Sequence, residues 1–482
     1  MTIQEYETKT NMAMKSLIIT TCLLVLAIVQ IGAQDDYCFG KDDSRPQTRH
    51  FTSKTAYQIA KSTNIEKQYL VPGCTPQKIW IFHRHGTRLP SKSTIQKFPR
   101  LEQLRDLIGG NYRRKSDLPE NRLCSEDLIA LKMWKLNASI TEDMENYLTS
   151  QGYEDLRGTA KTYQKYFPEV LTKEYDNEYY LFRHTDTQRT TESFKAFTEG
   201  LFGVNSGAVA QEIPEQDLLL RPYDYCTSWS SQNYKNEGSE SAKFRNSALW
   251  NQTLADISAR LGFNYTLDAS DIELMYDMCR YEQAWQVDRT SVWCAAFLAE
   301  QVTVFEYEDD LRYFYKSGYG NAANSRLNCR AAKDMLTHLS SKTAPHVISY
   351  FGHSTGVQTL INALGINKDE VPLLASNYDQ QGNRKWATSK IDPFAANFVA
   401  VKYQCDDDTE NKEKAIFFLN QDAVDLSWCK VGLCNWNEVL ERYSHLLNAD
   451  CDTYYCGDGA NAISISLGAL LMTAIVYLIN LM

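Results

Sequence analysis

The sequence predicts an α/β fold, with a three-layer core around a central, mostly parallel sheet and an inserted α-helical cap domain. Short apolar runs at residues 79–82, 179–183 and 346–352 have the length and composition of buried strands. Each run leads into residues that include arginine or histidine, and the long stretch at about 195–335 is mostly helical in pattern. Because strand ends meet at one edge of an open α/β sheet, we expect the three runs in one sheet, with the helices beside it.

The first residues carry a targeting signal rather than a part of this fold. Residues 16–31 form an apolar run behind Lys15, and small residues follow at Gly32 and Ala33. This pattern is typical of a secretory signal peptide, which we predict over residues 1–33. An N-terminal membrane anchor is the alternative.

The first strand run leads into the most informative motif of the chain. Residues 84–90 read Arg-His-Gly-Thr-Arg-Leu-Pro. The guanidinium groups of Arg84 and Arg88 offer forked donors that match phosphate oxygens. His85 is then a nitrogen nucleophile beside a bound phosphate, and Gly86 lets the backbone approach a ligand. A solvated basic loop is the alternative, but the complete pattern after a strand favours a phosphate site.

This motif resembles the signature of the histidine acid phosphatases, a branch of the histidine phosphatase superfamily. The resemblance implies that His85 becomes phosphorylated and that Arg84 and Arg88 hold the phosphate. It also implies a further arginine and a late histidine, which match Arg189 and His353, each after one of the strand runs. In this family the substrate lies in the cleft between an α/β core and an α domain.

Smaller landmarks resemble those of the multiple inositol polyphosphate phosphatases, and they extend the likeness from about Cys38 to Cys456. In chain order they are Leu148-Thr149 with Gly152, Asp277-Met278-Cys279-Arg280, Trp293-Cys294 and residues 311–321. We therefore expect a catalytic domain over residues 34–456. The resemblance implies hydrolysis of inositol polyphosphates as phosphate monoesters, through a phosphohistidine and without a metal or organic cofactor.

The chain departs from the family at one position of chemical importance. In the family an acidic residue after the late histidine protonates the leaving alkoxide, but here His353 precedes Ser354 and Thr355. The proton donor is thus unknown. Glu126 and Asp127 lie in a polar stretch and are candidates, but the sequence gives no geometric reason to choose either. Because a positioned general acid is typically worth about 10²–10⁴-fold in rate, a weakened, phosphate-binding pseudoenzyme is one alternative.

The same departure creates a competing motif. Residues 352–356 fit G-x-S-x-G, the nucleophile elbow of serine α/β-hydrolases. Ser354 would be the nucleophile, followed in order by Asp392 or Asp422 and by His445. This second alternative leaves the arginines unexplained, and the sequence has no HGGG-type oxyanion loop.

The remaining elements follow from hydrophobic patterning. Residues 242–261 and 295–313 have helical patterns that belong to the expected cap, and residues 106–150 are expected to add to it. Apolar runs at 398–401 and 416–419 predict two later strands. We find no internal repeat and no low-complexity linker.

Charge restricts the partners of the chain. The 482 residues carry a formal net charge of −10, which does not favour nucleic acid as a partner. A site for a polyphosphorylated small molecule must then be a local basic pocket. Lys92 and Lys97 are candidates for contacting further phosphates, with solvated surface lysines as the alternative. We expect structural, hydrogen-bonded roles for His83 and His184.

Cysteines and glycosylation signals indicate the secretory pathway. Of 13 cysteines, only Cys22 lies in the predicted signal peptide, and the other 12 allow up to six disulfides. Cys429 with Cys434 and Cys451 with Cys456 are tempting local pairs, although the sequence leaves the connectivity open. Sequons predict glycosylated surface loops at Asn137, Asn251 and Asn264.

The last residues form a second targeting signal. Residues 462–482 carry no charge, and small residues precede them at 456–461. Small residues before a terminal apolar tail are typical of a GPI signal, here over residues 457–482, and the tail is also long enough to span a bilayer. We therefore expect membrane attachment at the extracellular face of the plasma membrane, with a secreted or lumenal enzyme as the alternative.

Overall fold

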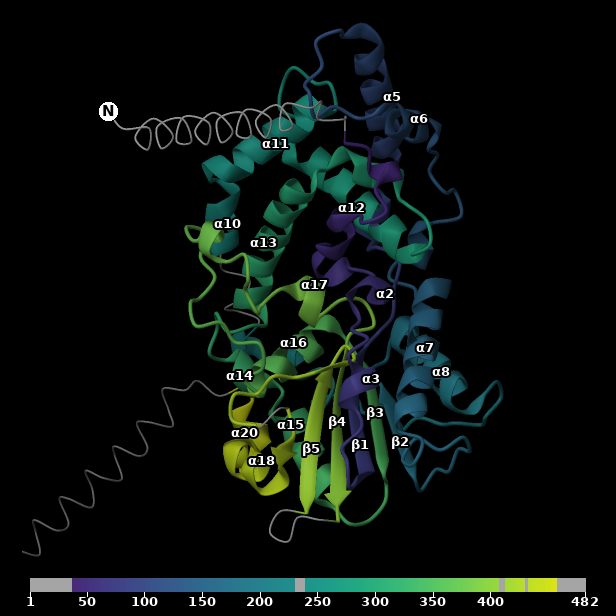
Figure 1. Ribbon diagram of the computed structural model, residues 1–482, viewed down its shortest axis with the longest axis vertical. Helices are drawn as coiled ribbons and strands as arrows, with labels where there is room; N and C mark the ends of the chain where they lie inside the picture. The colour runs from purple at the N-terminus through teal and green to yellow at the C-terminus, as the bar shows by residue number, and fades with distance from the viewer. Residues whose placement is uncertain (1–36, 230–238, 407–411, 430–431, 457–482) are drawn as a thin grey trace, which may run out of the picture.

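A mixed sheet forms the base of the molecule, and helices cover its two faces and the edge where its parallel strands end (Figure 1). The computed structural model describes residues 37–229, 239–406, 412–429 and 432–456. Within them, seven strands join in the order β2-β3-β1-β4-β5-β6, with β7 beside β5. The strands are β1 (Cys74–Arg84), β2 (Tyr180–His184), β3 (Val347–Gly352), β4 (Asn397–Cys405), β5 (Glu413–Leu419), β6 (Asp422–Ala423) and β7 (Cys434–Asn435). The five predicted strand runs are confirmed in β1 to β5.

The direction of the strands divides this sheet into two halves. β1 and β2 both pair with β3 in parallel, whereas β4 runs antiparallel to β1 and β5 antiparallel to β4. The prediction of a mostly parallel sheet is therefore wrong for the half beyond β1. Apolar runs that are buried on both faces look alike in either direction, so the pattern holds no sign of it. As a result, β4 begins at the edge where β1 ends, with Asn397 opposite His83.

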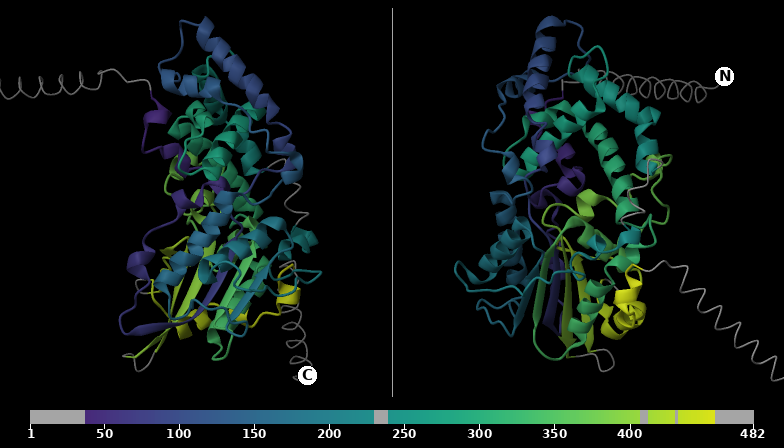
Figure 2. Two further views of the ribbon diagram at one scale, coloured as in Figure 1. Left: turned by 90° about the vertical axis from the view of Figure 1, so that its right-hand side faces the viewer. Right: turned by 180° about the vertical axis from the view of Figure 1, so that it is seen from behind.

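Two layers of helix enclose the sheet because side chains alternate along each strand. Trp80 and Phe82 belong to one apolar core, and Ile79 and Ile81 belong to a second core on the opposite face. α15 and α16 pack on the first face, and α7 and α8 on the second (Figure 2). These helices are α7 (Ser150–Tyr166), α8 (Gln188–Phe202), α15 (Cys329–Ser340) and α16 (Ser354–Ala363).

A helical lobe lies beyond the carboxyl ends of the parallel strands (Figure 1). It comprises α5 (Pro99–Arg114), α6 (Ser125–Met133), α10 (Glu240–Arg245), α11 (Ala248–Arg260), α12 (Ala269–Trp285) and α13 (Ala299–Lys316). The predicted helix at 242–261 is two helices, because Ser247 accepts a hydrogen bond from the Trp250 amide and starts α11. α8 and α15, near the ends of the expected cap range 195–335, pack against the sheet instead.

Short helical turns connect these elements. The 3₁₀ turns are η1 (Phe39–Lys41), η2 (Pro46–Arg49), η3 (Thr52–Lys54), η4 (Glu142–Met144), η5 (Pro222–Asp224), η6 (Val292–Ala296) and η7 (Tyr378–Gln380). The short α-helices are α2 (Tyr57–Ala60), α3 (Ile65–Gln68), α4 (Lys92–Ile95), α14 (Asn324–Leu327), α17 (Thr388–Ile391), α18 (Trp436–Arg442), α19 (Ser444–Leu447) and α20 (Cys451–Tyr454). Of these, η3 and α17 contact each other near the parallel strand ends.

All 12 cysteines beyond the predicted signal peptide are paired. The disulfides are Cys38–Cys124, Cys74–Cys405, Cys226–Cys456, Cys279–Cys294, Cys329–Cys451 and Cys429–Cys434. The local pair Cys429–Cys434 is confirmed. The suggested pair of Cys451 with Cys456 is wrong, because each joins a distant segment of the chain. Six disulfides mark the chain as a secreted or lumenal protein.

The targeting signals lie largely outside the described residues. The predicted signal peptide at 1–33 and the C-terminal tail at 457–482 both fall there. In the part of the chain that the structure describes, no helix combines the length and apolar character that a bilayer crossing requires. The sequon residues Asn137, Asn251 and Asn264 are all exposed, although Asn251 lies in α11 rather than in a loop.

Candidate active site

The three parallel strand ends bring the predicted site residues together. Arg84, the last residue of β1, pairs in register with Gly352 of β3, and His184 of β2 pairs with Phe351. His85 and His353 each follow one of these strands directly. Their rings lie 5.6 Å apart between centroids, in an edge-to-face arrangement. The sheet therefore places the two motif histidines side by side, as expected.

The turn after β1 is shaped by a backbone contact with α7. A Cβ atom on Gly86 would lie 2.3 Å from the Gly152 carbonyl oxygen, and a Cβ on Gly152 would lie 2.2 Å from the Thr87 carbonyl oxygen. Thr149 caps α7 by accepting a hydrogen bond from the Gly152 amide, and its hydroxyl donates to the Thr87 carbonyl. Only glycine at both positions permits this approach, which fixes the turn that presents His85.

His85 has the orientation and protonation state of a nucleophile. Its Nδ1 lies 2.9 Å from the Gly86 carbonyl oxygen, so Nδ1 carries the proton and Nε2 keeps its lone pair. Burial, together with the charges of Arg189 and Arg84, holds the pKa of His85 well below its usual value. The residue is buried, with 4% of its surface exposed. A neutral imidazole with a free Nε2 is therefore the resident form.

His353 is held between a hydroxyl and a cation. Its Nδ1 accepts from Arg189 at 3.3 Å, so Nε2 carries the proton and donates to the Thr185 hydroxyl at 2.9 Å. Burial and the charges of Arg189 and Arg221 keep its pKa well below the usual value. His353 is also the residue before the first turn of α16, whose free amides favour an anion.

Arg84 is the most constrained of the cations. Its Nη1 donates to the carbonyl oxygens of Ser53 at 2.6 Å and Asp392 at 2.7 Å, and its guanidinium lies 4.8 Å from the centre of the Phe394 ring. It is 3% exposed. With one edge of the fork bound by the protein, the position of the guanidinium is set before any ligand arrives.

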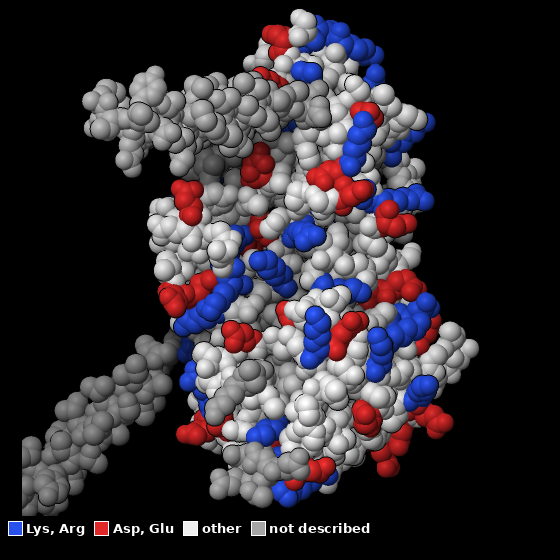
Figure 3. All heavy atoms as spheres, viewed as in Figure 1, with Lys and Arg blue, Asp and Glu red and all other residues white. Residues whose placement is uncertain are grey.

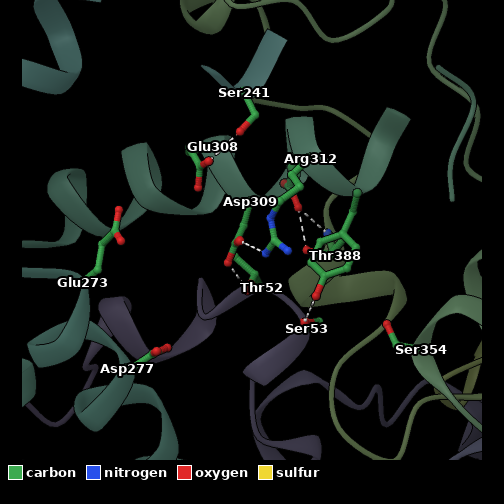
Figure 4. Close-up of polar contacts among 12 residues, drawn as sticks. Thr52, Ser53, Ser241, Glu273, Asp277, Glu308, Asp309, Arg312, Ser354 and Thr388 are labelled. Atoms are coloured by element: carbon green, nitrogen blue, oxygen red, sulfur yellow. Dashed lines mark hydrogen bonds and ion pairs between the residues drawn. The ribbon is translucent and has the colours of Figure 1, made fainter. Parts of the chain in front are cut away.

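The segment that receives Arg84 is itself anchored to the helical lobe. Asp309 of α13 accepts a hydrogen bond from the Thr52 hydroxyl at 3.0 Å (Figure 4). It accepts another from Arg280 at 2.9 Å. The hydroxyls of Ser53 and Tyr313 lie 3.1 Å apart. These contacts hold η3 in place, so the lobe and the sheet both contribute to the placement of Arg84.

Four arginines act on one another and on the two histidines. Burial and the charge of Arg88 lower the pKa of Arg189 to about 10, with further contributions from Arg221 and Arg84. Lys and Arg side chains also gather across the middle of the molecule in Figure 3, between the helical lobe and the sheet. Cations that repel one another in the free protein are favourably placed for a group with several negative charges.

Comparison with known proteins decides the family. The model of the histidine phosphatase superfamily, branch 2, matches residues 77–419, which include every motif residue above. The chain belongs to branch 2 of the histidine phosphatase superfamily.

Curated relatives and solved structures agree with this membership. Multiple inositol polyphosphate phosphatase 1 of Drosophila melanogaster is 64% identical over 455 residues, which cover 94% of this chain and 97% of that protein. Its human counterpart is 26% identical over 436 residues, which cover 84% and 88%.

Two solved structures share the fold. The phytase from D. castellii has a TM-score of 0.66 at 17% identity, covering 86% of this chain and 90% of its own. The multiple inositol polyphosphate phosphatase of Bifidobacterium longum, in complex with inositol hexasulfate, has a TM-score of 0.58 at 13% identity and covers 84% and 98%.

In this histidine phosphatase, the sequence motifs did not reveal one cation of the site. Arg221 acts on both His353 and Arg189, but it stands before a proline without any motif that would have revealed it. Lys92 and Lys97 are exposed, and Lys92 forms an ion pair with Glu142 at 3.2 Å. They remain candidates only for the outer part of a large substrate.

The carboxylates named from the sequence have other tasks. Glu126 pairs with Lys41, and Asp127 accepts hydrogen bonds from the amides of Phe39 and Gly40. Both therefore anchor η1 to α6. A carboxylate beside the late histidine is Asp392, whose Oδ2 accepts from the Ser354 hydroxyl. It precedes β4 and reaches the site because β4 starts at this edge.

The geometry of the site contradicts the serine-hydrolase alternative. Ser354, the first residue of helix α16, donates directly to the Asp392 carboxylate, and no histidine of the described residues accepts a hydrogen bond from it. Asp422 accepts a hydrogen bond from Asn64, and exposed His445 lies in α19. A triad needs its histidine between the serine and the acid, and this arrangement is missing among the described residues.

The other histidines and a possible metal group are structural. His83 packs between Phe197 and Phe351, at ring distances of 4.6 Å and 4.8 Å. His184 hydrogen-bonds through Nδ1 to the Thr185 carbonyl oxygen at 2.9 Å. Among the described residues, one group has metal-ligand proximity, Cys38, Cys124 and Asp127, but its two cysteines form a disulfide.

Proposed function

We propose that this histidine phosphatase hydrolyses phosphate monoesters of inositol polyphosphates through a phosphohistidine on His85. The observation that carries the proposal is the free Nε2 of a buried neutral His85, held 5.6 Å from the His353 ring and surrounded by arginines. A nitrogen lone pair beside a cationic phosphate site is what nucleophilic phosphoryl transfer requires.

The first chemical step follows from these positions. Arg84, Arg88, Arg189 and His353 orient the phosphoryl group and neutralise its charge. His85 Nε2 attacks phosphorus in line, and the bond to the ester oxygen breaks. Water then cleaves the phosphohistidine and restores the histidine. No step needs a metal, because the guanidinium groups stabilise the developing charge.

The substrate class is supported by charge and by relatives. Arg221 adds a cation beside the four groups that hold the reacting phosphate, so the site suits more than one phosphate. The curated proteins of Drosophila melanogaster and Homo sapiens that match this chain are named for activity on inositol polyphosphates. A highly phosphorylated inositol ring fits both observations.

Phosphate release from inositol hexakisphosphate tests the proposal. The wild-type protein is expected to release phosphate, and His85→Ala to lose at least about 10³-fold in rate while keeping its fold, because no other nucleophile is in place. Rapid quenching with ³²P-labelled substrate should trap label on His85. His346→Ala, at the opposite edge of the sheet, is the matched control and should keep wild-type activity.

The contrary result has a clear form. Tight binding of inositol hexakisphosphate without phosphate release would identify a phosphate-binding pseudoenzyme. Release that persists in His85→Ala would overturn the phosphohistidine mechanism while leaving the substrate class intact.

We also propose that the chain is glycosylated and attached to the extracellular face of the plasma membrane by a GPI anchor. The exposed sequon residues and the six disulfides support passage through the secretory pathway. Release from cells by a phosphatidylinositol-specific phospholipase is the expected result. Retention on the membrane would indicate a transmembrane tail instead, and recovery from the medium without the enzyme would indicate secretion.

A further inference from the structure

The reaction needs a proton that the groups described so far do not supply. When the phosphorus–oxygen bond breaks, the inositol oxygen leaves as an alkoxide, a strong base that requires protonation. Arginine is effectively always protonated in proteins, so the guanidinium groups are not the source, and His85 and His353 are neutral with their N–H groups engaged. A donor must therefore come from another group at the same edge.

Ser354 lies where such a donor is needed. It follows His353, which holds the phosphoryl group, and it is the first residue of α16. The residue is partly exposed, whereas the helix behind it is buried from Gly356 onward. Figure 4 shows Ser354 at the start of its helix, across from the segment that carries Ser53, whose carbonyl binds Arg84.

A buried carboxyl stands directly behind this hydroxyl. Asp392 Oδ2 is hydrogen-bonded to Ser354 Oγ, and Gln358 Nε2 donates to both atoms, at 2.6 Å to Asp392 and 3.0 Å to Ser354. The Gln358 amide is oriented in turn, because its oxygen accepts from the Ser317 hydroxyl. Gln358 of α16 and Ser317, which follows α13, thus hold Asp392 and Ser354 in place.

The surroundings of Asp392 favour its protonated form. The carboxyl is fully buried, Oδ1 has no hydrogen-bond partner among the described residues, and Arg84 Nη1 is 3.7 Å from it. Burial raises the pKa of Asp392 to about 6, against the opposing charge of Arg84 on β1 and the hydrogen bonds from Ser354 and Gln358 on α16. The carboxyl is thus available as an acid in mildly acidic solution.

We propose that Ser354 and Asp392 form a proton relay that replaces a carboxylate after the late histidine. As the ester bond breaks, its electron pair passes to the inositol oxygen, which takes the proton of Ser354 Oγ. When Asp392 Oδ2 is protonated, its O–H donates to Ser354 Oγ in place of the reverse hydrogen bond, so Ser354 takes this proton and Asp392 becomes a carboxylate. When water attacks the phosphohistidine, its proton returns through Ser354 to Asp392. Ser354 touches the leaving oxygen, and Asp392 acts through it. This relay rests on the phosphatase activity proposed above.

Leaving-group chemistry tests the relay directly. The p-nitrophenolate ion is a weak base that departs without protonation. An alkyl alkoxide is a strong base and must be protonated as it leaves. Ser354→Ala and Asp392→Asn are expected to lower kcat on inositol hexakisphosphate and glycerol 2-phosphate by about 10²–10⁴-fold, the usual range for a general acid. Both variants should hydrolyse p-nitrophenyl phosphate within about threefold of wild type. Thr355→Ala removes the neighbouring hydroxyl and is the matched control, with no selective effect.

The pH profile provides a second readout. For wild type, kcat on the alkyl phosphate should fall as pH rises through the pKa of Asp392, and Asp392→Asn should lose this limb. Equal losses on both classes of substrate would assign Ser354 and Asp392 to folding or phosphate binding and overturn the relay. Unchanged rates on the alkyl phosphates would overturn it as well. A wild-type protein inactive on every substrate would instead refute the proposed function.

Discussion

Arg189 shows how a single side chain connects the two halves of the site. It donates to His353 and is itself repelled by three other arginines, so its charge is costly until an anion binds. This cost is lower for arginine than for lysine, because a guanidinium stays charged under conditions in which a buried ammonium loses its proton.

Arg189→Lys should therefore affect more than the hydrogen bond to His353. We expect kcat/KM to fall about 10- to 100-fold because the forked donor is lost, and to fall further as pH rises, because the crowded ammonium deprotonates. Steady-state kinetics between about pH 5 and pH 9 would show this added pH dependence, because a crowded lysine ammonium loses its proton toward the upper end of that range. A parallel loss at every pH would mean that only geometry matters here.

At this scale the sequence predicts what lies next to a motif. Arg84, His85, Arg88, Arg189 and His353 follow strand runs or form part of a signature, so their convergence at one edge of the sheet could be predicted from the sequence. Arg221 and the pairing of Asp392 with Ser354 could not be inferred, because their partners are distant in sequence and no spacing rule relates them.

Among the elements, the contact between the β1 turn and α7 is the tightest backbone approach in the site. Gly86→Ala would place a methyl group against a carbonyl oxygen of α7, and Gly152→Ala would place one against a carbonyl oxygen of the β1 turn, so one of the two segments must shift. We expect each variant to lose about 1–3 kcal/mol in the free energy of unfolding, with a larger proportional loss of activity, because His85 moves with the turn.

Gly158→Ala is the control within the same helix. An added Cβ at Gly158 meets nothing within 4 Å, so this change should stabilise α7 by up to about 1 kcal/mol. Urea unfolding combined with phosphatase assays would separate the two cases. Wild-type activity in Gly152→Ala would show that the turn tolerates a displaced helix.

The hydrophobic patterns of the sequence were least informative about where helices begin and end and about the direction of the strands. Strand positions could be predicted from apolar runs, but strand direction could not, since both faces of the sheet are covered. The break between α10 and α11 depends on one serine cap at Ser247, which an apolar periodicity spanning both helices conceals.

For the whole molecule, buried histidines make stability depend on pH. His83 is fully buried with both ring nitrogens unpartnered among the described residues, and burial lowers its pKa to about 3. The unfolded chain takes up a proton below about pH 6.5, while the folded chain does not until about pH 3. Stability is therefore fully present above the unfolded value and is lost as pH falls.

His83→Phe should remove this contribution and keep the ring packing. Between about pH 6 and pH 4, the free energy of unfolding of the variant should fall less steeply than that of wild type, by about 1.4 kcal/mol per pH unit. Urea titrations at several pH values would measure the slopes. Exposed His445→Phe is the control, and an identical slope in His83→Phe would contradict the expectation.

Disulfides tie the end of the chain to its middle. Cys329–Cys451 closes a separation of 122 residues, and Cys429–Cys434 one of 5. From chain entropy, replacing the first pair with serine should cost about 5 kcal/mol, against about 2 kcal/mol for the second. Thermal unfolding of both double variants would test this order, and equal losses of Tm would show that loop length does not determine the effect.

The antiparallel direction of β4 has a consequence for how this site can change. A wholly parallel sheet supplies its active edge only with segments that leave strands, and those segments carry the motif. β4 adds a segment that enters a strand, and Asp392 arrives on it. In the proposed relay the donor Ser354 follows a motif strand, whereas the acid behind it, Asp392, stands on this separate segment. Substitutions around Asp392 can therefore change the pKa of that acid without altering any residue of the motif.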